Sequence, residues 1–248
     1  MAGGADCVTV LLGGDVMLGR GIDQILPHPG EPELREPYLR DASGYVRLAE
    51  RANGTFPRPV DWAWPWGEAL DVLDDVAPDV RVVNLETTLT ADGEFADGKP
   101  VCYRMHPDNL PALTAFRPDV CTLGNNHILD FGYRGLTDTV EALTQPGIQG
   151  PGAGADLYTA RRPAAVTVHG ERRVQVGSVA MTSSGVPESW AAHSDRPGVW
   201  LTRDLSGRVA DDVATGVLAH KRDGDVAIVS LHWGSNWGYA IAPDQIGF

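Results

Sequence analysis

Cysteine is scarce in this chain of 248 residues, which contains three: Cys7, Cys102 and Cys121. No two of them have the C-x-x-C spacing, so the sequence predicts neither a disulfide framework nor a zinc site built on cysteine. Each lies beside apolar residues, which favours buried free thiols. A chain of this length buries about 70–75% of its unfolded surface, so its core needs no disulfide.

Long apolar runs and an excess of basic residues are also missing. No stretch approaches the roughly 18 apolar residues of a membrane-spanning helix. The amino-terminal segment has no basic region before its short apolar run, so we interpret it as a first strand rather than a signal peptide and expect a cytoplasmic protein. The net charge of −13, from 20 Lys and Arg against 33 Asp and Glu, argues against nucleic acid or an anionic membrane as the main partner.

The chain does contain short β-rich apolar runs that alternate with stretches of helical periodicity. Residues 27–60 are rich in Pro, Gly and charge, which suggests a long loop or an inserted lobe. The alternation predicts one α/β layered domain over residues 1–248, with part of the sheet antiparallel near residues 164–181. Strands are expected at 8–12, 79–85, 119–123, 163–168, 172–181 and 225–231, the last of them buried. Helices are expected at 64–76, 107–116, 134–143 and 209–221, and a loop at 182–208.

Four of the predicted strands end in side chains that bind metals or transfer protons. Carboxyl ends of strands meet at the crevice where open α/β sheets bind ligands. Carboxylate, amide oxygen and imidazole suit Mn²⁺, Fe or Zn²⁺, and a carboxylate can bridge two ions about 3.5–4 Å apart. Each residue alone has an ordinary explanation as a turn, a helix cap or a structural histidine, but their coincidence favours a metal site. These residues are Asp15, Asn84, Glu86, Asn125, Asn126, His127 and His232.

Four motifs carry a resemblance to a known family. They are GGDVMLGRGID (13–23), VVNLETTLT (82–90), TLGNNHILDFG (122–132) and VSLHWGSNWGY (229–239). In order and spacing they resemble the successive blocks of the CapA family of poly-γ-glutamate capsule synthesis proteins, over nearly the whole chain. The resemblance implies a calcineurin-like metallophosphoesterase fold, with mixed β-sheets flanked by helices, and two divalent metal ions (Mn, Fe or Zn).

The same resemblance implies roles for individual side chains. His127 would be the acid or transition-state stabiliser, and Asp130 would orient His127 or cap the next helix. Arg20 would either hold an anionic substrate group, because guanidinium binds carboxylate and phosphate in a bidentate way, or form a surface ion pair. The metal ligands would be Asp15 on the first ion, Glu86 in the bridging position, and Asn126 and His232 on the second ion.

Two departures from the family pattern matter. Metallophosphoesterases commonly have a histidine two residues after the first Asp, where this chain has Met17. The same departure is usual in CapA-like sequences, and it weakens a plain phosphatase interpretation. The family also continues beyond the His-Trp-Gly block with a helix and a strand ending in Gly-His-x-x-His. We therefore expect a C-terminally truncated fold with an incomplete metal site and an exposed apolar sheet edge.

Three hypotheses for function follow. The first is a metal-dependent enzyme of capsule-type polymer synthesis that acts on a glutamyl polymer or peptide. The second is a peptide epimerase or a phosphoesterase with the same metals. The third is a truncated, non-catalytic binding module whose tryptophans, Trp62, Trp64, Trp233 and Trp237, form a partner surface, with Trp66 packed in the core. The oligomeric state is not indicated.

Overall fold

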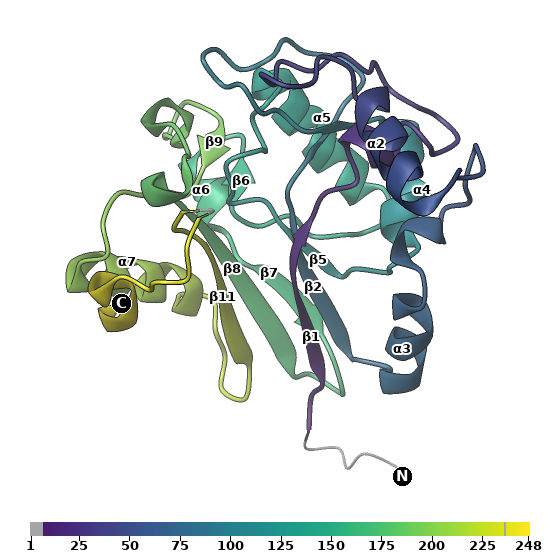
Figure 1. Ribbon diagram of the computed structural model, residues 1–248. Coiled ribbons are helices and arrows are strands. Elements are labelled where there is room, and N and C mark those ends of the chain that lie inside the picture. The colour runs from purple at the N-terminus through teal and green to yellow at the C-terminus, as the bar shows by residue number, and fades with distance from the viewer. Residues whose placement is uncertain (1–6, 236) are drawn as a thin grey trace.

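The computed structural model describes residues 7–235 and 237–248 and shows a mixed α/β chain with two larger sheets (Figure 1). The strands are β1 Val10–Val16, β2 Val80–Leu85, β3 Thr88–Leu89, β4 Arg104–Met105, β5 Val120–Thr122, β6 Ala153–Gly154, β7 Ala164–Thr167, β8 Arg173–Met181, β9 Gly198–Val199, β10 Leu201–Thr202 and β11 Val226–His232. The α-helices are α1 Arg20–Asp23, α2 Ser43–Asn53, α3 Ala69–Val76, α4 Leu110–Thr114, α5 Gly132–Thr144, α6 Leu157–Arg161, α7 Gly207–Leu218 and α8 Pro243–Gly247.

The first sheet is parallel and has the order β1-β2-β5. In the second sheet β8 is central: it pairs in parallel with β10 and β11 and antiparallel with β7. The expected α/β class and the antiparallel segment near residues 164–181 are therefore confirmed. Since β1, β2 and β5 run the same way, their carboxyl ends meet at one edge of the sheet.

The two sheets pack face to face, and the alternation of side chains along each strand explains how. On β2, Val80 and Val82 are buried in an apolar cluster with Val174 and Val176 of β8. Val83 and Leu85, which point the other way, belong to the cluster formed with the helices. This layering positions the ends of β2 and β11, from different sheets, on the same side of the molecule (Figure 1).

Helices cover the outer faces of both sheets. On the second sheet, Val213 and Val217 of α7 pack against Val179 of β8. Helix α7 approaches so closely that a Cβ at Gly177 would lie 2.4 Å from a methyl carbon of Val217. Only glycine fits at that position without moving the helix.

Several local expectations need correction. Residues 182–208, expected as a loop, contain β9 and β10. Residues 27–60, expected as a long loop or an inserted lobe, contain α2. Cys7 is exposed, whereas Cys102 and Cys121 are buried as expected. Trp66 stacks on Phe116 at a centroid distance of 4.5 Å, in agreement with its predicted place against the core.

Strand β11 was expected to be buried, but it is only half covered. Among the described residues its one sheet neighbour is β8, and Val226 and Val229 are 39% and 40% exposed. On the first sheet, β1 is likewise an edge strand, and its Leu12 is 61% exposed. Both edge strands therefore carry exposed apolar side chains.

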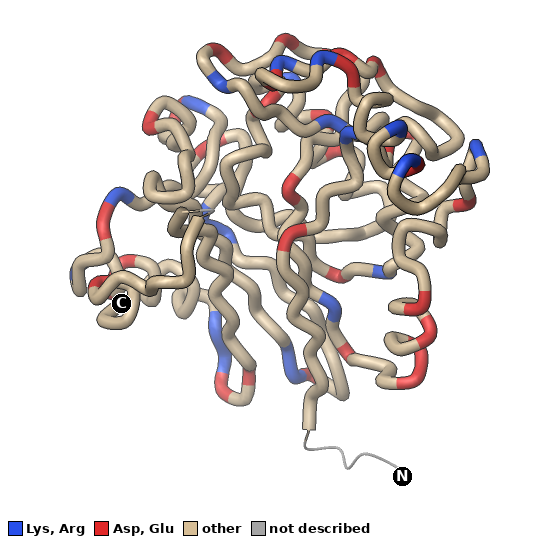
Figure 2. The backbone as a smooth tube through the Cα atoms, viewed as in Figure 1, with Lys and Arg blue, Asp and Glu red and all other residues tan. Residues whose placement is uncertain are grey.

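Charge is spread over the surface rather than collected in one place. Figure 2 shows acidic residues on many loops and helices. Helix α3 alone carries three exposed aspartates, Asp71, Asp74 and Asp75. Within the described part of the chain, no helix has the length and apolarity needed to cross a membrane.

The contrast between buried and exposed strand positions gives a stability prediction. Leu85 on β2 is fully buried, so Leu85→Ala leaves a cavity and should lower the free energy of unfolding by about 2–5 kcal/mol. Leu12→Ala on the neighbouring edge strand is the matched control and should change it by less than about 0.5 kcal/mol. Urea denaturation monitored by circular dichroism measures both. Equal effects of the two substitutions would contradict the layering described here.

Candidate metal and acid–base site

Two carboxylates meet where β1 and β2 end. Asp15 on β1 lies in register with Asn84 on β2, after an irregularity between Leu12 and Asp15. The Glu86 N–H donates to the Val16 carbonyl at 2.9 Å, which continues the strand pairing by one residue. The parallel ladder therefore places Glu86 on the same face as Asn84 and diagonal to Asp15, and the two carboxyl groups are hydrogen-bonded to each other.

A histidine and an amide complete this group. Ligand atoms of Asp15, Glu86 and His232 all lie within 4.8 Å of one another, although His232 comes from the end of β11 in the other sheet. His232 Nε2 donates to Asn126 Oδ1 at 3.0 Å. All four side chains expected as metal ligands are thus together, and two carboxylates, one imidazole and one amide oxygen suit a divalent transition-metal ion.

The electrostatics of the carboxylate pair are unusual. Burial, together with the hydrogen bond to Asp15 and the charge of Asp15, raises the pKa of Glu86 to about 8. Burial also acts to raise the pKa of Asp15, but hydrogen bonds with Glu86 and Asn84 outweigh it and lower that pKa below its ordinary value. Without a cation, the pair therefore holds one proton, on Glu86, at neutral pH, because two adjacent carboxylates cannot both ionise cheaply.

Two asparagines fix the position of Asp15. Asn84 Nδ2 donates to Asp15 Oδ1 at 2.8 Å, and Asn84 Oδ1 accepts from Asn125 Nδ2 at 3.0 Å. Thr122 Oγ1 also donates to Asn84 Oδ1, at 3.2 Å. Because both ends of the Asn84 amide are occupied, its orientation is determined, and its NH₂ group faces the carboxylate.

His127 lies on the other side of Glu86, with its Nε2 3.6 Å from Glu86 Oε1. Its Nδ1 contacts Asp130 Oδ2 at 2.6 Å. Asp130 is fully buried and also accepts from the Tyr103 N–H at 2.6 Å. Asp130 therefore contacts the imidazole of His127, and no side chain caps the start of α5. Burial lowers the pKa of His127, partly offset by Asp130.

Two residues near His127 were missed from the sequence. Lys99 forms an ion pair with Asp130, and its Nζ lies 3.0 Å from His127 Nδ1. The Tyr103 ring stacks on the His127 ring at a centroid distance of 3.8 Å. Lys99 lies in a loop and Tyr103 just before the two-residue β4, so neither stands at the end of a recognisable strand. No pattern in the sequence marked them.

Arg20 follows β1 closely but does not point at the carboxylates. Its guanidinium pairs with Glu36 at 2.7 Å, and the Glu36 side chain is 3% exposed. The expected ion pair therefore exists, but it is buried rather than superficial. The guanidinium also lies over the Tyr103 ring, 4.5 Å from its centroid, which places Arg20 one ring away from His127.

The chain matches a known family of bacterial proteins. The model of the bacterial capsule synthesis protein family, PGA_cap, matches residues 9–248. The chain belongs to this family. The match covers every residue of the candidate site, so the PGA_cap assignment includes the Asp15, Glu86, Asn126 and His232 group and the His127–Asp130 pair.

Relatives of this PGA_cap chain are found in mycobacteria and bacilli. A probable polyglutamine synthesis accessory protein of Mycobacterium tuberculosis (strain H37Rv) is 75% identical over 249 residues, which cover all of this chain and 66% of the relative. The capsule biosynthesis protein CapA of Bacillus anthracis is 21% identical over 96% of this chain and 49% of its own. The PGA biosynthesis protein CapA of Bacillus subtilis is 22% identical over 94% and 50%. The chain thus spans from half to about two thirds of their lengths.

The raised pKa of Glu86 predicts how stability depends on pH. Between the ordinary value of 4.5 and about 8, the folded state holds a proton that the unfolded state has lost. The contribution of Glu86 to the stability of the metal-free protein should therefore fall as pH rises through this window, by up to about 1.4 kcal/mol per pH unit, whereas the lowered pKa values of His127 and His232 act in the opposite direction below pH 6.5. Glu86→Gln should remove most of this dependence. Urea denaturation in chelator at pH 5, 6 and 7.5 measures it.

The exposed Glu141 of α5 provides the matched control, because Glu141→Gln makes the same chemical change away from the site. This variant should keep the wild-type pH dependence. A Glu86→Gln protein that still loses stability between pH 5 and 7.5 at the wild-type rate would show that the carboxylate pair does not hold the proton.

Proposed function

We propose that this chain carries the metal-dependent acid–base site of a protein that acts in the synthesis of a polyglutamate-type polymer. The polymer class is supported by membership in PGA_cap and by the names of the mycobacterial and bacillar relatives. The observation that carries the metal dependence is the convergence of Asp15, Glu86 and His232 within 4.8 Å. The two facing sheets with helices outside support a metallophosphoesterase-like layering as part of the same proposal.

Asp15, Glu86, His232 and Asn126 would hold the divalent ion. The fit rests on the donor set: Asp15 and Glu86 already share a proton that a cation would displace, and Asn126 and His232 present their polar atoms to each other at 3.0 Å. Asn84 keeps the Asp15 carboxylate in place through its 2.8 Å hydrogen bond. When bound, such an ion polarises a carbonyl or phosphoryl oxygen and stabilises the negative charge that develops there.

His127 is the residue best placed to move a proton. Its Nδ1 contacts Asp130 and its Nε2 faces Glu86 and the metal ligands, so in the tautomer with the proton on Nδ1 the lone pair of Nε2 points toward the site. Lys99 balances the charge of the buried Asp130 carboxylate. An imidazole whose pKa is lowered by burial is largely neutral at pH 7, and in that form Nε2 accepts a proton from a bound substrate.

Two specific reactions fit this arrangement of side chains. They are alternatives within the proposal, and experiment distinguishes them. Removal of a proton from a glutamyl Cα by His127, followed by return of a proton from solvent to the opposite face of that carbon, would make the protein a peptide epimerase. Attack of water on a phosphate ester would make it a phosphoesterase. Deuterium uptake from D₂O into a γ-glutamyl peptide identifies the first, and release of p-nitrophenol from its phosphate esters identifies the second.

Metal binding is the direct test of the donor set. Mn²⁺ or Zn²⁺ titrated into the metal-free protein should bind, and Glu86→Gln and His232→Ala should each weaken binding at least about tenfold by removing a charged or imidazole donor. The exposed His220 gives a matched control in His220→Ala, which should bind like the wild type. Isothermal titration calorimetry measures the affinities. Unchanged affinity in both site variants would exclude these residues as ligands.

The role of His127 is tested in cells. A gene carrying His127→Gln should fail to restore the polymer in a strain from which the gene has been deleted, since loss of a proton-transfer group costs about 10²–10⁴ in rate. The glutamate released by acid hydrolysis of the purified envelope polymer is the readout. His220→Ala should restore it. Full restoration by His127→Gln, with normal metal binding, would instead support a non-catalytic accessory role.

A further inference from the structure

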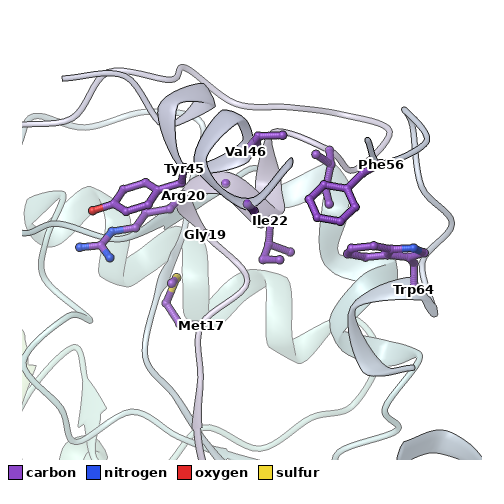
Figure 3. Close-up of a pocket in the computed structure, with 11 residues that line it drawn as sticks. Met17, Gly19, Arg20, Ile22, Tyr45, Val46, Phe56 and Trp64 are labelled. Carbon is purple, nitrogen blue, oxygen red and sulfur yellow. The ribbon is translucent and has the colours of Figure 1, made fainter. Parts of the chain in front are cut away.

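A separate cavity lies beside the polar site. It has a volume of about 340 Å³, is open to solvent on one side, and is lined by the turn after β1, helices α1 and α2, and the segment that carries Phe56 and Trp64 (Figure 3). Its walls are mainly hydrocarbon and aromatic: Met17, Ile22, Val46, Ala49, Phe56 and Trp64. Phe56 and Trp64 meet edge to face, with centroids 5.5 Å apart, and form one end of the cavity.

The polar groups in the cavity wall are turned away or neutralised. Tyr45 donates its hydroxyl hydrogen to Glu36, and the same Glu36 forms the ion pair with Arg20. The Arg20 guanidinium points away from Phe56 and Trp64, and it lies over the rings of Tyr45 and Tyr103 (Figure 3). An anionic glutamyl side chain placed in this cavity would lose its hydration without gaining a free cation, which is costly.

The cavity and the polar site share a wall. Met17 follows Asp15 by two residues, so the turn that lines the cavity begins at the carboxylate pair. From the other side, His127 stacks on Tyr103, and Tyr103 supports the Arg20 guanidinium.

Size limits the occupant. An engineered cavity of about 150 Å³ binds benzene, and natural ligand pockets begin at about 300 Å³. A cavity of 340 Å³ has room for a group of roughly two fused rings. We propose that this cavity binds the uncharged, apolar group of a small-molecule ligand, with the size of a bicyclic aromatic ring, and that glutamyl carboxylates are excluded from it.

The neutral fluorophore N-phenyl-1-naphthylamine is a suitable probe, because its emission rises when it leaves water. The wild-type protein should bind it at one saturable site, equally with and without chelator, since the cavity contains no proposed metal ligand. Free glutamate at high concentration should not displace it. Failure of the wild type to bind the probe would overturn the proposal without affecting the proposed metal site.

Paired variants on α2 locate the binding. Ala49→Trp fills the cavity and should weaken probe affinity at least about tenfold, because the bulky ring takes the place of the ligand. Leu48→Trp introduces the same ring at a residue that is 49% exposed and does not line the cavity, so affinity should stay within about twofold. Thermal unfolding confirms that each variant is folded, and Ala49→Leu is the smaller replacement if Ala49→Trp is not. Wild-type affinity in a folded Ala49→Trp or Ala49→Leu protein would place the probe elsewhere and refute the proposal.

Discussion

The constraint on which the site depends is the forced proximity of two carboxyl groups, Asp15 and Glu86. Strand pairing brings them together, because β1 and β2 are parallel neighbours in register. Burial and mutual repulsion then raise the pKa of Glu86 to about 8, which is a cost that folding must offset. Sites that carry such a cost are candidates for function, since a purely structural role would be served equally well by an amide.

The rest of the chain is arranged so that this pair can exist. The first sheet supplies both carboxylates and, through Asn84, the donor that holds one of them ionised. The second sheet supplies His232, which reaches the pair because the two sheets pack through Val80, Val82 and the valines of β8. The packing of the apolar core between the sheets therefore determines how far the His232 imidazole lies from the two carboxylates.

The sequence predicts this part of the molecule well, for a physical reason. Apolar strands that end in Asp15, Glu86 or His232 are visible as local patterns. The rule that parallel neighbours share a carboxyl edge brings Asp15 and Glu86 together, whereas His232 joins them from the other sheet. The prediction fails where a residue acts through long-range contact alone. Lys99 reaches Asp130 from a loop, and Tyr103 reaches His127 by ring stacking. Burial of β11 was also misjudged, because an apolar strand looks the same whether it lies at a sheet centre or at an edge.

The stack of His127, Tyr103 and Arg20 lies between the polar site and the apolar cavity. On one side, buried carboxylates and imidazoles favour a cation. On the other, a hydrocarbon-lined cavity disfavours any unpaired charge. Arg20 is tolerated at this boundary because Glu36 neutralises it and two aromatic rings cover its faces. The backbone at Arg20 has a φ of +50°, a left-handed conformation that costs free energy for a residue other than glycine. The guanidinium of Arg20 contacts the rings of both Tyr45 and Tyr103. A smaller side chain would not reach both rings, which gives a reason for an arginine at this position despite the cost.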